Sequence, residues 1–144
     1  MTTVRQVLQA KGWAVWSISP ETTMYEALQL MAEKNVGALV VLDEGRLVGI
    51  FTERDYARKV ALQGRSCTDT LVREVMTPRV IYVHPDQTVE DCMGVMTKHH
   101  IRHLPVLEGG KLVGLISIRD VIEALLAERE FLIEQLESYI TSGS

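Results

Sequence analysis

The sequence predicts a mixed α/β fold of the α+β type, in which one β-α-β-β-α unit occurs twice. The main observation is an internal repeat: residues 17–60 align with residues 82–125, without a gap, at a spacing of 65 residues. Of the 44 aligned positions, 12 are identical, whereas ordinary amino-acid usage would give about two or three. A unit of about 45–60 residues buries only a marginal amount of surface for a lone domain, so we expect the two copies to pack against each other.

Each copy predicts a helix that begins after a threonine. A short apolar stretch, residues 15–18 or 80–83, leads to a proline, and Thr23 or Thr88 then stands at the N-cap position with an acid three residues later. Apolar residues follow at i, i+3, i+4 and i+7: Met24, Ala27, Leu28 and Met31 in the first copy, and Val89, Cys92, Met93 and Met96 in the second. This spacing gives each helix one buried stripe, so we interpret the methionines as core residues.

A pair of apolar segments with a glycine-containing turn follows each helix. Residues 38–42 and 46–51 are separated by Asp43-Glu44-Gly45, and residues 104–107 and 111–116 by Glu108-Gly109-Gly110. Short apolar runs on both sides of such a turn predict β-hairpins. A second helix is expected to begin at Thr52 or Ser117, directly after each hairpin.

Further helices are predicted on both sides of the repeat. The spacing of Val4 and Leu8 predicts a short helix that ends at Gly12, and neither Gly nor Pro interrupts the chain from Asp120 to about Tyr139. A C-terminal helix of this length reaches roughly 30 Å, so its apolar face needs a partner. A symmetric homodimer is the simplest partner, and the alternative is that the helix covers its own repeats. We therefore divide the chain into an N-terminal helical segment (1–14), two repeats (15–65 and 66–126) and a C-terminal helix with its tail (127–144).

The composition excludes several functional classes. A net charge of −4 and a pI near 5.6 provide no basic surface for a polyanion, so nucleic acid is not an expected partner. The longest apolar run, residues 36–42, is far shorter than the roughly 18 residues of a membrane span, so no membrane segment is expected. Cys67 and Cys92 lack metal or redox spacing, and no secretory leader is recognisable, so we expect a cytoplasmic location.

The candidate site is a repeated tetrad, Thr52-Glu53-Arg54-Asp55 and Ser117-Ile118-Arg119-Asp120, where a strand ends and a helix begins. One interpretation is purely structural, because a Ser or Thr followed three residues later by an acid is a capping box. The other is functional: a helix N-terminus attracts a phosphate, and a carboxylate accepts both hydrogen bonds of a ribose diol. The two interpretations are compatible.

The order of these motifs resembles the CBS-domain pair, or Bateman module: a Pro-x-x-Thr helix, an apolar strand, Gly-x-Leu-Val-Gly and Thr/Ser-x-x-Asp, all in two copies over about residues 12–126. The resemblance implies a pseudo-two-fold disc with two clefts that hold AMP, ADP, ATP, NAD-type dinucleotides or S-adenosylmethionine. It also implies that Thr52 and Ser117 approach phosphate or ribose, and that Asp55 and Asp120 bind the ribose hydroxyls.

The resemblance further implies which residues surround the adenine. These are Trp16, Val36, Gly37 and Ala38 in one copy and Ile81, Ile101, Arg102 and His103 in the other, with Thr77, Leu104 and Pro105 completing the predicted ligand-binding set. A phosphate beside an aspartate needs compensating charge, for which the candidates are Arg54, Arg79, Arg102, Arg119 and His103. The alternative is that the arginines lie on a solvated face. Because Arg102 and His103 replace Gly37 and Ala38, the second cleft is expected to prefer more negative phosphate groups.

These observations favour a non-enzymatic sensor. His99, His100 and His103 resemble a metal cluster, but the helix is expected to fray near His100 and no acid or cysteine completes the set, so we predict no metal. No motif combines a nucleophile, a base and an orienting group, so we predict no catalytic residues. We predict a regulatory module that needs no cofactor, binds an adenosyl ligand and signals to a separate protein. The alternative is an interaction module with vestigial clefts.

Overall fold

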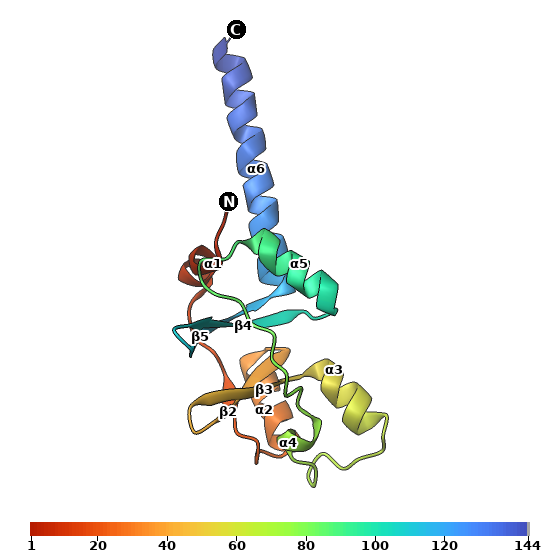
Figure 1. The fold of residues 1–144 in the computed structure, drawn as a ribbon. Coiled ribbons are helices and arrows are strands. Elements are labelled where there is room, and N and C mark those ends of the chain that lie inside the picture. Colours follow the sequence, from red (N-terminus) through yellow and green to blue (C-terminus); the bar gives the residue numbers. More distant parts are fainter. Residues whose placement is uncertain (144) are drawn as a thin grey trace. The chain divides into compact units, whose positions relative to one another are not determined.

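The structure, a computed structural model, describes residues 1–143 (Figure 1). The chain divides into two compact units. The central unit is Ala14–Ile81, and the terminal unit combines Met1–Trp13 with the chain from Tyr82 onward. Each unit contains a helix, a β-hairpin and a second helix in that order, which confirms the predicted mixed helix-and-strand fold.

The central unit is built on a three-stranded sheet of order β1-β2-β3. Its elements are β1 (Ser17–Ile18), α2 (Met24–Lys34), β2 (Ala38–Asp43), β3 (Arg46–Thr52), α3 (Glu53–Tyr56), the π-helical turn η1 (Ala57–Ala61) and α4 (Val72–Val75). β1 is parallel to β2, and β2 pairs with β3 as the predicted antiparallel hairpin, from Ala38 opposite Thr52 to Asp43 opposite Arg46. The hairpin therefore places the start of β2 beside the start of α3.

The terminal unit repeats this arrangement with one strand fewer. Its elements are α1 (Val4–Lys11), α5 (Val89–His99), β4 (His103–Glu108), β5 (Lys111–Ser117) and α6 (Ile118–Gly143). The predicted strand at residues 80–83 is reduced to a single bridge between Val83 and Val106. In the central unit Val40 N–H donates to the backbone O of Trp16 at 3.3 Å, but the aligned residue of β4 is Pro105, which has no N–H to donate.

Capping residues begin and end the two repeated helices at matching positions. Thr23 Oγ1 accepts a hydrogen bond from Glu26 N at 3.2 Å, and Thr88 Oγ1 accepts one from Asp91 N at 3.1 Å. Both predicted N-caps are therefore confirmed. Each helix ends at a residue in the left-handed conformation, with φ of 53° at Asn35 and 55° at His100.

The predicted apolar stripes form the cores of the units. In the central unit Met24, Ala27 and Met31 of α2 pack with Phe51 of β3 and with the α4 residues Val72 and Val75. In the terminal unit Val89, Cys92 and Met96 of α5 are buried. Burial raises the pKa of the Cys92 thiol to about 11, so this residue is a core side chain and not a reactive thiolate.

α1 and α4 are related by a second, shorter sequence repeat. Val4-Arg5-Gln6-Val7 and Val72-Arg73-Glu74-Val75 are related by 68 residues rather than 65. Val4 N–H donates to Gln87 O at 2.8 Å, and Val72 N–H donates to Thr22 O at 2.8 Å, so both segments dock in the same way on the chain before α5 or α2. Residues 66–81, which we grouped with the second repeat, thus pack within the central unit, and α1 packs within the terminal unit.

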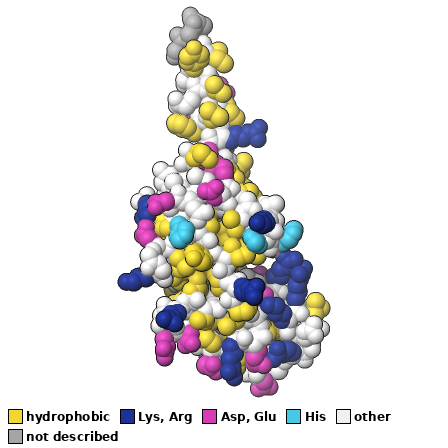
Figure 2. All heavy atoms as spheres, in the orientation of Figure 1, with side chains coloured by type: hydrophobic (Ala, Val, Ile, Leu, Met, Phe, Trp, Pro, Cys, Tyr) yellow, Lys and Arg dark blue, Asp and Glu magenta, His cyan; other side chains and the backbone are white. Residues whose placement is uncertain are grey.

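The long helix α6 projects from the rest of the terminal unit (Figure 1). It begins at Ile118, directly after the predicted start at Ser117, and extends beyond Tyr139, so its 26 residues span about 39 Å. Hydrophobic side chains lie along its protruding part (Figure 2). Within residues 1–143 no helix combines the length and the apolar character that crossing a membrane requires.

Candidate functional site

The tetrad in the central unit forms a closed hydrogen-bonded cap. Thr52 N–H donates to Asp55 Oδ2 at 3.0 Å, and Asp55 N–H donates to Thr52 Oγ1 at 3.2 Å, which completes a capping box at the start of α3. Lys59, one turn further along, places its ammonium 3.2 Å from Asp55 Oδ1. The tetrad therefore forms the capping box that the structural interpretation predicts. In addition, Asp55 has a charged partner, and its side chain is 13% exposed.

The terminal unit repeats the cap but uses a different lysine. Ser117 N–H donates to Asp120 Oδ2 at 2.8 Å, and Asp120 N–H donates to Ser117 Oγ at 3.2 Å. The charged partner of Asp120 is Lys11, at the end of α1, whose ammonium lies 2.6 Å from the same carboxylate oxygen. The two aspartates thus have equivalent backbone settings and non-equivalent cations.

The segment that enters the first hairpin strand meets each tetrad through the backbone. Glu53 N–H donates to Gly37 O at 3.1 Å, and Ile118 N–H donates to Arg102 O at 2.8 Å. Residues Gly37, Ala38, Thr52 and Asp55 thus lie together as a central half-site, and residues Arg102, His103, Ser117 and Asp120 as a terminal half-site. In both, a carboxylate lies beside a strand entrance.

The remaining predicted site residues fall into three groups. Ala38, Leu104 and Pro105 are buried, and Leu104 has no exposed surface, so none of the three offers a side chain to a ligand. Val36, Thr77, Ile81 and Ile101 are half-buried, and Thr77 exchanges backbone hydrogen bonds with Ile50 of β3 at 2.9 and 3.1 Å. The exposed residues are Trp16, Arg54, Arg79, Arg102 and Arg119. The centre of the Trp16 ring lies 4.4 Å from the Lys34 ammonium. Arg119 forms an ion pair with Glu123 at 3.1 Å and belongs to a solvated face.

The electrostatics of the terminal half-site follow from burial and from Lys11. Burial opposes ionisation of Asp120, but hydrogen bonds from Lys11 and from Ser117 N–H outweigh it and lower the pKa of the carboxyl below 3.8. Burial, together with the positive charge of Lys11, lowers the pKa of His103 below 6.5, against the opposing effect of Asp120. His103 is therefore neutral at neutral pH, and the positive charge of this half-site comes from Arg102 and Lys11.

This pKa shift predicts an acid-sensitive stability. Because the pKa of His103 is lower in the folded chain than its ordinary 6.5, the unfolded chain binds more protons in the window below that value. The free energy of unfolding should therefore decrease as the pH falls from about 7.5 to about 5. Urea unfolding across this range should show a smaller decrease for His103→Gln. Equal decreases in both proteins would contradict the assignment, and Asp120 does not interfere because its titration lies below 3.8.

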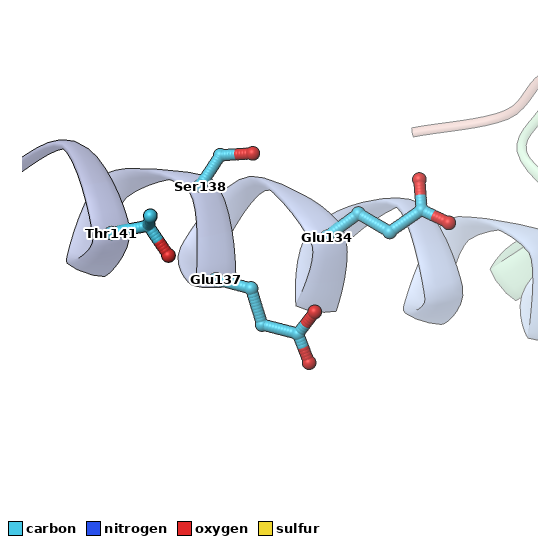
Figure 3. Close-up of a pocket in the computed structure, with 4 residues that line it drawn as sticks. All are labelled: Glu134, Glu137, Ser138 and Thr141. Carbon is cyan, nitrogen blue, oxygen red and sulfur yellow. The ribbon is translucent and has the colours of Figure 1, made fainter.

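One hollow borders the central half-site through Val36 and Glu53, and another lies along α6. The first, of about 460 Å³, is lined by Leu28, Met31, Ala32, Asn35, Val36, Glu53 and Tyr56 of the central unit. The other follows a single helix: Glu134, Glu137, Ser138 and Thr141 form a polar strip along α6 (Figure 3). One helix provides no opposing wall, so this strip does not enclose a ligand.

No metal site is formed in the part of the chain that the structure describes. His99 is the last residue of α5, and His100 leaves the helix with a positive φ of 55°. Residues 1–143 contain no group of three or more His, Cys, Asp or Glu side chains that is arranged to hold a metal ion.

Sequence reasoning missed both lysines of the half-sites. Lys59 is at i+4 from Asp55 on the same helical segment, a spacing that was available as a signal. Lys11 is 109 residues from Asp120, and the 65-residue alignment does not include α1. The signal that points to Lys11 is the Val-Arg-x-Val repeat at 68 residues, which aligns Lys11 with the predicted site residue Arg79.

Comparison with known proteins identifies close similarities. The model of the CBS domain family matches residues 13–62 and 72–127. The mitochondrial CBS domain-containing protein CBSX3 of Arabidopsis thaliana is 39% identical over 153 aligned positions, which cover 99% of this chain and 73% of that protein. A protein with CBS domains from Burkholderia ambifaria is 51% identical, with a TM-score of 0.85 over 88% of this chain and 95% of that one. The hexameric CBS-CP12 protein of bloom-forming cyanobacteria is 29% identical, with a TM-score of 0.76 over 83% of this chain and 66% of that one.

Proposed function

Because the chain belongs to the CBS-domain family and carries two copies of the domain, we propose that it is a non-enzymatic sensor of an adenosine-containing ligand. CBS-domain pairs are regulatory modules, and the proposal adds the signal to which this one responds. The observation that carries it is the pair of matching half-sites, each with a half-buried aspartate in the first turn of the helix that follows a hairpin.

The chemistry of each half-site suits a ribose. An ionised carboxylate accepts the two hydrogen bonds of a ribose diol, and these charge-assisted bonds are stronger than neutral ones. The backbone groups at Gly37 and Arg102 lie next to the tetrads and provide polar contacts for the adenine edge. The ligand class is AMP, ADP, ATP, NAD(H) or S-adenosylmethionine, since all of these contain adenine and a ribose diol.

The proposed sensor acts on a separate protein. A ligand changes the state of a module only if it binds one conformation more tightly than another, so binding is expected to change hydrogen exchange or oligomeric state. The assembly that we propose is a homodimer through α6. A cytoplasmic location stays a prediction, since the Arabidopsis relative is mitochondrial by name.

The proposal is tested by a thermal-shift screen against AMP, ADP, ATP, NAD, NADH and S-adenosylmethionine. A ligand of the native state adds about 2.7 kcal/mol of stability at a hundredfold excess over Kd, so the native chain should show a clear shift with at least one compound. Asp55→Ala and Asp120→Ala should each reduce the shift, and the double variant should abolish it. Asp43→Ala, at an exposed hairpin turn, is the control and should leave the shift unchanged.

Two outcomes would contradict parts of this proposal. Equal shifts for the native chain and the double variant would remove the ribose assignment. Flat curves with all six compounds would favour the second candidate, an interaction module, for which the exposed apolar residues of α6 are the supporting observation. Chromatography of ligand recovered after incubation tests the non-enzymatic part, because a regulatory module returns its ligand unchanged.

A further inference from the structure

Lys11 links α1 to the terminal half-site through two contacts. Its Nζ atom lies 2.6 Å from Asp120 Oδ2 and donates a second hydrogen bond, of 3.0 Å, to the backbone O of Leu115 on β5. The Asp120 side chain is 16% exposed and that of Lys11 is 38% exposed. The carboxylate is thus largely shielded, while the ammonium that neutralises it is still in contact with solvent.

The central unit shows that this arrangement is not a requirement of the fold. Arg79 occupies the position that corresponds to Lys11, yet within residues 1–143 it forms no ion pair, and Asp55 pairs with Lys59 instead. The counterpart of Leu115 O is Ile50 O, which accepts a hydrogen bond from Thr77 N–H at 2.9 Å. The difference arises because α4 ends at Val75, before Pro78, whereas α1 remains helical as far as Lys11.

A ribose that binds Asp120 has to compete with Lys11. Asp120 Oδ2 already accepts hydrogen bonds from Ser117 N–H and from Lys11 Nζ. Removing one partner from a shielded ion pair is unfavourable, unless the released charge finds another partner. A ligand phosphate supplies that partner, and the long, flexible lysine side chain can move to reach it. A neutral nucleoside offers no such compensation.

We propose that Lys11 is a specificity-determining residue of the terminal half-site, which it restricts to adenosyl ligands that carry a phosphate. This inference rests on the proposed function and adds a property of one half-site. Lys11 holds Asp120 while the half-site is empty, and it pairs with the phosphate when the ribose takes its place.

The test compares AMP with adenosine, which differ only in the 5′-phosphate. Calorimetric titrations in the Asp55→Ala background report on the terminal half-site alone. We expect Lys11→Met to weaken AMP binding by about tenfold or more, while adenosine binding stays the same or improves. Lys11→Arg should retain most of the preference for AMP, because it retains the charge. Lys111→Met removes an exposed cation at the far end of β5 from Ser117, and should leave the preference unchanged.

The outcomes separate this inference from the proposed function. If Lys11→Met and its parent have the same ratio of the AMP and adenosine dissociation constants, Lys11 is only a structural partner of Asp120 and the inference fails. It also fails if the Asp55→Ala chain binds neither compound while the native chain binds AMP, and in that case the sensor function survives in the central half-site. If the native chain binds no adenosyl compound, both fail. Circular dichroism of each variant establishes that the fold is retained.

Discussion

Phe51→Ala is expected to lower the free energy of unfolding of the central unit by about 3–5 kcal/mol. Phe51 lies on β3, is fully buried, and packs in the core with α2 and α4. Removing its ring leaves a cavity. The backbone hydrogen bonds between β2 and β3 hold the hairpin in place, so the surrounding chain cannot collapse to fill that cavity. The measurement is urea unfolding followed by circular dichroism, fitted with two transitions if the units unfold separately.

Tyr25→Ala is the matched control for this prediction. Tyr25 lies on α2, but its side chain points away from the core and is 49% exposed. Truncation of an exposed aromatic side chain should cost less than about 1 kcal/mol. If both variants lose the same amount, Phe51 does not have the core role that its burial indicates.

The elements that the sequence predicts correctly are those determined by local chemistry. Thr23 and Thr88 cap their helices because a threonine with an acid three residues later satisfies free N–H groups without any long-range contact. The hairpins follow because Gly45 and Gly110 both adopt φ of 79° in their turns, a conformation that glycine adopts at little cost. The stripe of α2 and α5 follows from helical periodicity alone.

The elements that the sequence does not predict depend on contacts between distant residues. Lys11 reaches Asp120 only because α1 docks beside β5, where a Cβ on Gly114 would lie 2.7 Å from Leu8 Cδ1. The main repeat has a spacing of 65 residues, and the repeat of α1 and α4 has a spacing of 68. The three additional residues lie in the linker before β1, so a gapless alignment of the main repeat does not include α1. The bridge at Val83 similarly depends on Pro105, whose missing N–H shortens a strand only if residues 80–83 lie on that side of β4, and the sequence does not show which segment lies there.

Helix α6 is expected to hold two copies of the chain together. Its exposed apolar residues are Ile122, Leu126, Phe131, Leu132, Ile133, Leu136, Tyr139 and Ile140. With 3.6 residues per turn, Leu132 and Leu136 lie on the opposite side of the helix from Glu134 and Ser138 of the polar strip in Figure 3. Tyr139 and Ile140 lie on the same side as Leu132 and Leu136. A long helix with an apolar side opposite a polar strip matches a second copy of itself, and a two-fold interface buries the same residues from both chains.

Replacing both Leu132 and Leu136 with glutamine should therefore convert the dimer into a monomer. Burial of one fully exposed leucine contributes about 1.5–3 kcal/mol, but Leu132 and Leu136 are only 59% and 54% exposed in one chain. The four leucines of a two-fold interface therefore contribute at least about 3 kcal/mol, so the dimer dissociation constant should rise at least about 100-fold. Sedimentation equilibrium over a range of concentrations measures this constant directly. The control is Glu134→Gln with Glu137→Gln, which changes the acidic side of the same helix and should leave the dimer intact or slightly stronger, because like charges are removed. A native chain that is still monomeric at about 100 μM, roughly 100 times a dissociation constant of 1 μM, would contradict this role of α6. The apolar side of the helix would then be expected to bind a different protein.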